Sequence, residues 1–277
     1  MNESSGGKSL FGLRDKVIVI TGAAGLLGRQ HAEAVARAGG IAVLLDLAAT
    51  PVQALAQDLG RRYGVPAEGC VVDITQEAAI EAACGESLKK FGHIDGLVNN
   101  AAHNPKMENG GDGFFRLENF PLATWEADVA VGLTGAFLCA KHYGAAIARQ
   151  GGSIVNISSD LGLVGPDQRL YRKPDLPADQ QPVKPVSYSV VKSGLIGLTR
   201  YLATYWAERG VRCNALCLGG VENNQDPSFL KEVSSRIPMG RLARPDEYQG
   251  ALVFLLSEAS SYMNGAVISI DGGRTAW

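Results

Sequence analysis

Short apolar runs alternate with segments of helical spacing along almost the whole chain. The apolar runs predict strands at Val17–Ile20, Ile41–Leu45, Cys70–Val72, Gly96–Asn99, Ser153–Ile157, Val211–Leu216 and Val267–Ile270. Between them, the apolar positions predict helices at about Gly25–Ala38, around Ala54 and Leu55, at Glu77–Lys89 and near Ser187–Ala207. Short buried strands separated by helices are typical of a parallel sheet covered on both faces. Right-handed crossovers then give a doubly wound α/β fold.

Two connections between predicted strands and helices are much longer than the others. One is His103–Asn119, and the other is Asp160–Ser187, which contains five prolines. Long connections in a compact domain are usually functional or mobile. We expect both to leave the sheet at the carboxyl ends of strands, where open α/β sheets bind ligands.

The composition is that of a globular protein with one large core. The 277 residues are 46% hydrophobic and 19% charged, and the formal net charge is -2. We expect a single domain over residues 13–277, preceded by a flexible tail at residues 1–12. The charge balance gives no reason to expect a nucleic-acid or membrane partner, and no uninterrupted apolar run approaches the roughly 20 residues of a membrane helix.

The cysteines indicate neither a disulfide framework nor a metal site. There are five of them, an odd number, and no C-x-x-C pair occurs. Such cysteines usually serve as small apolar filler. We therefore expect no metal and a reducing, cytoplasmic compartment.

A glycine-rich turn joins the first predicted strand to the first helix, with the sequence Thr21-Gly-Ala-Ala-Gly-Leu-Leu-Gly28. The start of a helix offers free amides and a positive dipole end to a pyrophosphate. In this interpretation Gly22 permits the turn, Gly25 lets the backbone approach the phosphate, and Gly28 lets the helix pack against the strand. The pattern favours a dinucleotide-binding site.

Asp46 ends the second predicted strand and favours NAD over NADP. Its carboxylate suits the hydroxyls of an adenosine ribose and would repel a 2′-phosphate. The alternative is an ordinary turn residue. Other candidate cofactor-binding residues follow the same strand ends or lie in the glycine turn: Leu27, Leu47, Asp73, Ile74, Asn100, Ala101 and Ala102.

Tyr188 and Lys192 are four residues apart on a predicted helix, so the phenol and the ammonium share one face. Phenol titrates near pH ~10 and is a poor base at neutral pH. A nearby ammonium favours the phenolate, and the pair could then move a proton to or from an alcohol or carbonyl oxygen. Alone, this spacing is a weak signal.

Together, these pieces resemble the short-chain dehydrogenase/reductase family from about Gly12 to the C-terminus. The motifs that carry the resemblance stand in the family's order: TGAAGLLG at 21–28, VVDI at 71–74, NNAA at 99–102, GSIVNISS at 152–159, YSVVK at 188–192, RCNALCLGG at 212–220 and NGAVISIDGG at 264–273. The resemblance implies a Rossmann-like three-layer sandwich with a mostly seven-stranded parallel sheet. It also implies hydride transfer through NAD(P).

The resemblance implies a role for each candidate catalytic residue. Tyr188 is the acid/base, Lys192 lowers its pKa and holds the nicotinamide ribose, and Ser159 hydrogen-bonds the substrate oxygen. Gly219 and Val221 would face the nicotinamide. The family commonly forms dimers or tetramers on two long helices, here near Val129–Ala148 and Ser187–Ala207.

Four positions depart from the family pattern. The glycines are spaced T-G-x-x-G-x-x-G, and Leu218 stands where a proline is common. Gly132 stands where the family usually has an asparagine, whose main-chain carbonyl holds a water near the lysine. Glycine keeps that carbonyl, so we expect activity with a slower or rewired proton relay.

The fourth departure is the long gap between Ser159 and Tyr188. We predict that the extra residues, within Asp160–Ser187, form a wall or lid over the substrate, because both ends adjoin catalytic groups. The alternative is a surface embellishment far from the pocket.

The loops offer mainly polar groups to a substrate: His103, Asn104, Lys106, Arg169, Arg172, Asn223, Asn224 and Gln225. They favour a polyhydroxylated or phosphorylated molecule over a steroid or fatty acyl chain. The motifs NNAAHNPK and DGGRTAW are also similar to members associated with bacterial sugar modification, including nonulosonic acid synthesis.

Two other functional classes stay open. A catalytically silent nucleotide-binding regulator or scaffold would keep Asp46 and the glycine turn, and Gly132 lends it some support. A sugar-nucleotide epimerase or dehydratase is suggested only by the glycine spacing. The intact set of Ser159, Tyr188 and Lys192 favours an enzyme that interconverts a secondary alcohol and a ketone.

Overall fold

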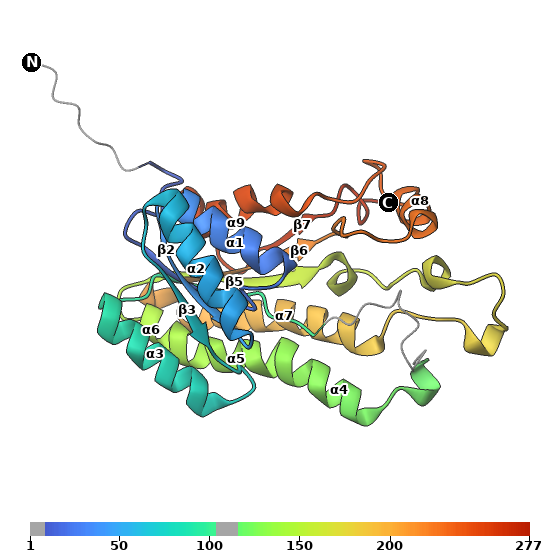
Figure 1. Cartoon of the computed structure of the whole chain (residues 1–277), viewed down its shortest axis with the longest axis horizontal. Coiled ribbons are helices and arrows are strands. Elements are labelled where there is room, and N and C mark those ends of the chain that lie inside the picture. The colour runs from blue at the N-terminus through green and yellow to red at the C-terminus, as the bar shows by residue number, and fades with distance from the viewer. Residues whose placement is uncertain (1–8, 104–115) are drawn as a thin grey trace, which may run out of the picture.

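The computed structural model describes residues 9–103 and 116–277. The strands of these residues form one parallel sheet of seven, in the order β3-β2-β1-β4-β5-β6-β7, which confirms the predicted Rossmann-like fold (Figure 1). The strands are β1 (Val17–Thr21), β2 (Ile41–Asp46), β3 (Ala67–Val71), β4 (Gly96–Asn99), β5 (Gly152–Ser159), β6 (Val211–Leu218) and β7 (Val267–Ile270).

The sheet brings the predicted site motifs to one edge. Central strand β1 is buried along its whole length and pairs in parallel with β2 and β4. Because the strands are parallel, their carboxyl ends all meet at the same edge, where Thr21, Asp46, Asn99, Ser159 and Leu218 end their strands.

Edge strand β3 corrects one prediction. It runs over Ala67–Val71, whereas the apolar pattern predicted Cys70–Val72. Ala67–Cys70 are only partly buried and Val71 is exposed, so polar Glu68 is tolerated and the hydrophobic pattern is weak there. Gly69 is packed so closely on α2 that a Cβ would lie 2.7 Å from the Val52 carbonyl oxygen.

Helices cover both faces of the sheet (Figure 1). One face carries α1 (Leu26–Arg37), α2 (Ala49–Tyr63) and α9 (Gln249–Leu256). The other face carries α3 (Glu77–Phe91), α4 (Leu122–Val129), α5 (Gly135–Cys139), α6 (Ala145–Ile147) and α7 (Val186–Tyr205). Helix α8 (Pro227–Ser234) lies beyond the carboxyl edge of the sheet, near the C-terminus. Short 3₁₀ turns occupy η2 (Leu117–Asn119), η5 (Asp160–Gly162), η6 (Gln168–Tyr171), η7 (Ala178–Gln180), η8 (Ala207–Arg209), η9 (Pro245–Tyr248) and η10 (Glu258–Ser260).

Helices α4, α5 and α6 form one continuous rod that is interrupted by two π-helical turns, η3 (Ala130–Thr134) and η4 (Ala140–Gly144). By length and composition alone, Leu122–Ile147 is apolar enough to cross a membrane. Core helices of other proteins pass the same test, and this one packs Cys139, Tyr143 and Ile147 into the core beneath the sheet.

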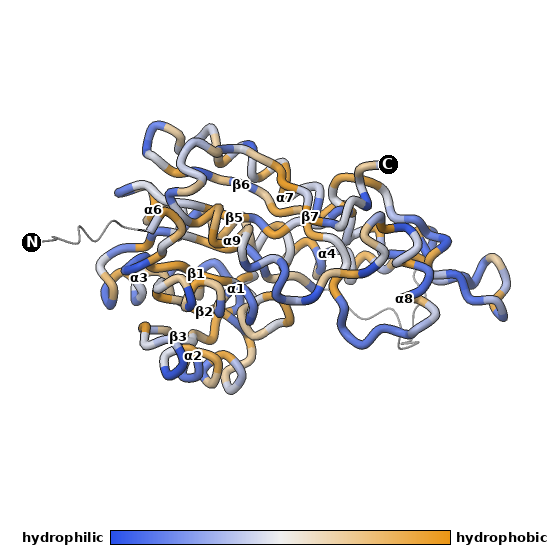
Figure 2. Tube along the Cα trace, turned by 90° about the horizontal axis from the view of Figure 1, so that it is seen from above, coloured by the Kyte–Doolittle hydropathy of each residue, from blue (hydrophilic) through white to orange (hydrophobic). Residues whose placement is uncertain are grey.

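The long connection after β5 lies beside α8, beyond the carboxyl ends of the strands (Figure 1). Its Leu170 is buried with Val233, Ile237 and Leu242 in a small apolar cluster of its own. Figure 2 shows apolar positions concentrated in the strands, whereas hydrophilic positions dominate this outer region. The predicted loop His103–Asn119 falls mostly outside the described residues, as does the predicted tail.

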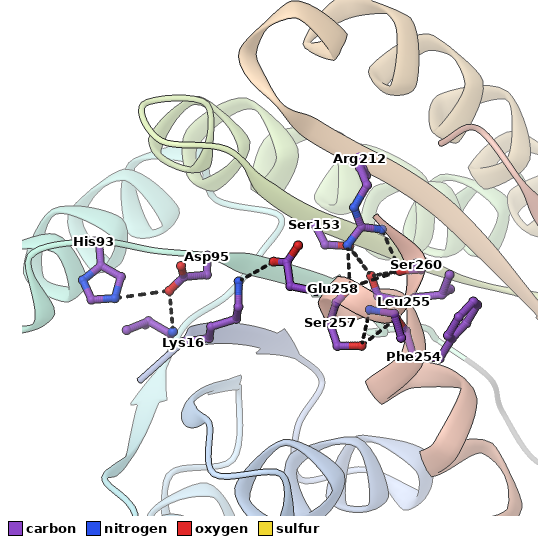
Figure 3. Close-up of polar contacts among 12 residues, drawn as sticks. Lys16, His93, Asp95, Ser153, Arg212, Phe254, Leu255, Ser257, Glu258 and Ser260 are labelled. Carbon is purple, nitrogen blue, oxygen red and sulfur yellow. Dashed lines mark hydrogen bonds and ion pairs between the residues drawn. The ribbon is translucent and has the colours of Figure 1, made fainter. Parts of the chain in front are cut away.

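At the opposite edge, Arg212 ties β6 to the turn after α9 (Figure 3). Its guanidinium donates to the carbonyls of Leu255 and Ser257, at 3.0 and 3.1 Å, and to the Ser260 hydroxyl at 2.8 Å. Burial lowers the pKa of Arg212, against the opposing charge of Glu258. The side chain therefore satisfies several acceptors that water reaches poorly.

We expect Arg212→Met to lower the free energy of unfolding by about 2–4 kcal/mol, because it leaves partly buried acceptors without a hydrogen-bond donor. Lys16→Met is the matched control, since the exposed Lys16–Glu258 pair, 3.3 Å apart, should contribute less than about 1 kcal/mol. Urea denaturation of the two variants measures both values. Equal losses would show that Arg212 acts only as another surface charge.

Candidate active site

One cavity of about 1370 Å³ runs along the carboxyl ends of the strands. Every residue that the sequence proposed for cofactor binding or catalysis lines it: Gly22, Gly25, Leu27, Gly28, Asp46, Leu47, Asp73, Ile74, Asn100, Ala101, Ala102, Ser159, Tyr188, Lys192, Gly219 and Val221. The structure therefore brings these residues together, and the role of each stays a prediction.

The glycine turn forms the floor of one end of the cavity. Gly22 has a φ of +61°, and a Cβ there would lie 2.8 Å from the Ala101 Cα. A Cβ on Gly28 would lie 2.1 Å from the Gly22 carbonyl oxygen. No side chain caps the start of α1 at Gly25. The first amides of α1 therefore meet the cavity at a turn too tight for side chains, which fits a pyrophosphate.

Thr21 and Asn100 fasten this turn to the neighbouring strand. The Thr21 hydroxyl accepts hydrogen bonds from the Asn100 and Ala101 amides, each at 3.0 Å. The Asn100 side chain donates back to the carbonyls of Thr21, at 2.9 Å, and Gly22, at 3.1 Å. The phosphate end of the cavity is thus held by side chains as well as by the sheet.

Asp46 is placed at the end of β2, over the glycine turn. Its carboxylate accepts from the Ala24 amide at 2.9 Å and from the Ala48 amide at 3.1 Å. These bonds fix the orientation of the carboxylate while the side chain still lines the cavity. The adjacent Leu47 is 67% exposed and brings no positive charge that could hold a 2′-phosphate.

The other end of the cavity holds the candidate catalytic residues. Ser159 ends β5 and is 4% exposed, while Tyr188 and Lys192 lie one turn apart on α7. The Lys192 ammonium donates to the Ile157 carbonyl at 2.8 Å, and the Ser158 hydroxyl donates to the Lys192 carbonyl at 2.7 Å. These two bonds lock α7 against β5, so the three side chains share one wall.

The direction of the Tyr188 pKa differs from our expectation. Burial raises the pKa of Tyr188 and outweighs the lowering effect of its hydrogen bond with Ser159. The Lys192 ammonium donates to the Ile157 carbonyl and lies 5.8 Å from the Tyr188 ring centroid, and its lowering of the Tyr188 pKa stays a prediction. Burial and the charge of Lys184 also lower the pKa of Lys192 to about 8.

Known proteins share both the sequence and the architecture. The short chain dehydrogenase family model matches residues 16–171, and the enoyl-(acyl carrier protein) reductase model matches residues 179–275. D-threitol dehydrogenase of Mycolicibacterium smegmatis is 34% identical over 96% of this chain and 95% of its own length. Cis-4-hydroxycyclohexanecarboxylate dehydrogenase of Sinomonas cyclohexanicum is 34% identical over 95% and 97%.

The chain belongs to the short-chain dehydrogenase/reductase family. A crystal structure of gluconate 5-dehydrogenase from Burkholderia cenocepacia, in complex with NADP and tartrate, superposes with a TM-score of 0.83 at 29% identity, covering 97% of this chain and 98% of that one. Membership makes the protein an oxidoreductase that acts on alcohol or ketone substrates with a nicotinamide cofactor.

Against this family background, Lys184 is a second cation beside Tyr188 that sequence reasoning did not single out. Its ammonium lies 3.9 Å from the centroid of the Tyr188 ring, within cation–π distance. Burial lowers the pKa of Lys184 to about 8, against the charge of Asp160. No motif marks this lysine, because a proline-rich connection of unpredictable path brings it to the ring.

Asp160 is the second residue that the motifs did not identify. It is 2% exposed and accepts hydrogen bonds from the Ser159 hydroxyl and the Leu161 amide, each at 2.8 Å. Its other oxygen pairs with Arg274, from the C-terminal turn. A buried carboxyl group therefore contacts the candidate catalytic serine.

A third polar cluster joins His103, Asp128 and Ser187 at the start of α7. Asp128 is buried, accepts from the Ser187 hydroxyl and lies 2.5 Å from His103 Nδ1. The cluster ties the connection after β4 and helix α4 to the residue before Tyr188. It was not predicted, because these residues are far apart in the sequence.

Part of the connection between Ser159 and Tyr188 forms a wall of the cavity. Residues Arg169–Pro174, Pro182 and Lys184 line it, and the segment packs on α8 through Leu170 and Val233. Asp167 bonds to Arg169 and, at 2.9 Å, to Arg236, which follows α8. The predicted wall is therefore present, whereas movement as a lid stays a prediction.

Gly132 lies in the π-helical turn η3 and packs directly against α7. A Cβ on Gly132 would lie 2.5 Å from Val191 Cγ1, beside Lys192. Val191 is buried and fills the space that a side chain at 132 would need. Val191 on the facing helix thus occupies the space beside Gly132.

We expect Gly132→Asn alone to cost about 1–3 kcal/mol of stability through overpacking and to lower activity. The double variant G132N/V191A should recover most of that stability, because it removes the γ-methyl groups in the way. Thermal or urea denaturation, together with steady-state rates, compares the two with V191A alone. A fully stable G132N would contradict this packing argument.

Proposed function

We propose that the protein is an NAD-dependent oxidoreductase that interconverts a secondary alcohol and a ketone on a polar, sugar-like or phosphorylated substrate. The observation that carries the proposal is the junction of two sites in one cavity. A tight glycine turn with Asp46 forms one end, and Ser159, Tyr188 and Lys192 form the other. A nucleotide binder without chemistry would need only the first of these.

The residues present fit a bound NAD. The amides at the start of α1 would hold the pyrophosphate, Asp46 the adenosine ribose, and Lys192 with Tyr188 the nicotinamide ribose. When bound, NAD accepts the hydride that leaves the alcohol carbon, or NADH returns it to the ketone. NAD is preferred over NADP in this proposal because of Asp46, although the gluconate 5-dehydrogenase structure holds NADP.

In alcohol oxidation Tyr188 takes the proton of the substrate hydroxyl, and in ketone reduction it returns that proton. Ser159 hydrogen-bonds the same oxygen and holds it against Tyr188. The ammonium groups of Lys184, at 3.9 Å, and Lys192, at 5.8 Å from the ring, favour the phenolate once it forms. Burial opposes that ionisation by raising the Tyr188 pKa, and in this proposal the two lysines partly offset the effect.

The named relatives support a polar substrate. One acts on D-threitol, one on cis-4-hydroxycyclohexanecarboxylate, and one structure is a gluconate 5-dehydrogenase. Cationic side chains at the substrate end of the cavity fit the same class: Arg169, Arg172, Lys173, Lys184 and Arg274. A link to bacterial sugar modification rests on the sequence motifs alone.

We further propose a homodimer or homotetramer in the cytoplasm. Exposed aromatic rings on α7 support an interface, because Tyr201 and Tyr205 are stacked 5.6 Å apart and more than 60% exposed. The five free cysteines fit a reducing compartment. Light scattering of wild type and Tyr201→Glu tests the interface, since the variant should dissociate.

The test of the function is NADH formation from NAD with a panel of polyols, sugar acids and sugar phosphates. We expect a sustained rise in NADH absorbance with at least one of them. A regulator or scaffold would bind NAD, measured by calorimetry, and form no NADH. An epimerase or dehydratase would convert its substrate with no net NADH, so a sustained rise would exclude it.

A further inference from the structure

The C-terminal turn after β7 carries an arginine into the catalytic end of the cavity. Asp271 holds this turn by accepting from the Gly273 and Thr275 amides, each at 2.9 Å, and from the Thr275 hydroxyl at 2.6 Å. Arg274, between them, lines the cavity. The turn therefore presents one specific side chain to the substrate end.

The backbone of this turn is fixed by close packing. Gly272 and Gly273 have φ values of +67° and +90°. A Cβ on Gly272 would lie 2.7 Å from Ile237 Cγ2, and one on Gly273 would lie 2.9 Å from Pro238 Cγ. The backbone next to Arg274 is thus restricted to one conformation by its packing.

The guanidinium of Arg274 is held close to the reacting groups. It donates to one oxygen of Asp160, while the other oxygen accepts from the Ser159 hydroxyl at 2.8 Å. The guanidinium and the Ser159 hydroxyl thus bind the two oxygens of the same carboxylate. Arg274 therefore lies within a few bonds' reach of an oxygen bound to Ser159.

The guanidinium has capacity for a further partner. Arginine has five N–H donors in a fixed fork, and among the described residues one hydrogen bond, to Asp160, uses them. The side chain is 15% exposed and lines the cavity, so its other donors have access to a ligand there. Planar forks of this kind suit carboxylate and phosphate oxygens.

The local charge also favours an anion. Three cations surround the Tyr188 side chain or its neighbour Asp160: Arg274, Lys184 and Lys192. Asp160 is the buried carboxylate among them and is 2% exposed. Asp271, which holds the turn, is a second carboxylate nearby, so three cations face two carboxylates and the balance of charge still favours a bound anion. Asp160 keeps the guanidinium oriented.

We propose that Arg274 is a specificity-determining residue that binds an anionic group of the substrate, a carboxylate or a phosphate, attached a few bonds from the carbon that exchanges the hydride. Asp160 is the positioning residue: it binds both Arg274 and the Ser159 hydroxyl and so fixes where each lies relative to the other. The inference rests on the proposed function and narrows its substrate to hydroxy acids or sugar phosphates. The competing explanation is that Arg274 only neutralises Asp160.

The first arm of the test compares D-gluconate, sorbitol 6-phosphate and sorbitol with the full chain and NAD. We expect wild type to prefer one of the two anions over neutral sorbitol, and the better anion identifies carboxylate or phosphate. In Arg274→Met the ratio of kcat/KM for that anion to kcat/KM for sorbitol should fall at least about 100-fold, mainly through KM. Arg274→Lys should retain part of the ratio.

The second arm needs no turnover. Calorimetry measures malonate binding to the NAD-loaded protein, and R274M should bind it at least about 30-fold more weakly. Arg241→Met, which removes an exposed arginine outside the cavity, controls for general loss of positive charge. The double variant D160N/R274M leaves no unpaired buried carboxylate, so it keeps the test valid if R274M folds poorly.

The two arms separate this inference from the function beneath it. Equal malonate binding by wild type and R274M, or a preference for neutral sorbitol that R274M leaves in place, would overturn the anion site while NADH formation stood. If R274M loses malonate binding but wild type forms no NADH from any alcohol tested, the anion site stands and the proposed NAD-dependent alcohol oxidation is rejected.

Discussion

Tyr188→Phe should lower kcat for alcohol oxidation by about 10²–10⁴-fold, the usual contribution of a positioned acid/base. The variant keeps the aromatic ring that Lys184 contacts at 3.9 Å from the centroid and loses only the hydroxyl, so the fold and NAD binding should survive. In wild type the rate should rise with pH as Tyr188 loses its proton. Because burial raises that pKa, the rise should extend to alkaline pH, and it should vanish in the variant.

Tyr171→Phe is the matched control for this prediction. Tyr171 lines the same cavity and packs on Phe229, with ring centroids 6.0 Å apart. Burial raises the pKa of Tyr171 to about 12, so Y171F removes a buried hydroxyl from the same cavity and leaves the proposed acid/base in place. A loss of kcat in Y171F as large as that in Y188F would assign the effect to polarity of the cavity rather than to Tyr188.

The wild-type preference for NAD over NADP, expressed as a ratio of kcat/KM values, should fall about 100-fold or more in the double variant D46S/L47R. The change removes a carboxylate and supplies a guanidinium where a 2′-phosphate would lie. Two unit charges about 4 Å apart near a protein surface interact by roughly 4 kcal/mol, and each 1.4 kcal/mol is about tenfold. Steady-state rates with both cofactors measure the ratio.

Asp46→Asn separates charge from structure at this position. The amide oxygen can still accept from one of the amides that Asp46 holds, Ala24 or Ala48. D46N should therefore stay folded, and it should lose most of the preference for NAD over NADP because it lacks the negative charge. A wild type that uses NADP as well as NAD would contradict the role given to Asp46.

The fold could be predicted because its signals are local. The buried strand Val17–Thr21 is apolar over its first four residues, and the glycine turn stands directly between this strand and a helix. Parallel strands then place their ends together without further information. The edge strand Ala67–Val71 was predicted with other bounds, Cys70–Val72, because partial exposure weakens the hydrophobic pattern that marks a strand.

The charged surroundings of the site could not be predicted in the same way. Arg274 reaches Asp160 across 114 residues of sequence, and Lys184 reaches Tyr188 from an irregular, proline-rich connection. Neither contact leaves a periodic signal. Spacing alone also cannot reveal burial, which is why a lowered pKa was expected for Tyr188 where burial raises it.

The most direct test of the central claim is a crystal structure of the protein with NAD and a hydroxy-acid inhibitor. The account predicts the nicotinamide ribose within hydrogen-bonding distance of both the Tyr188 hydroxyl and the Lys192 ammonium, and the inhibitor oxygen between Tyr188 and Ser159. A Tyr188 hydroxyl directed away from the cavity, or a nucleotide bound elsewhere, would contradict it.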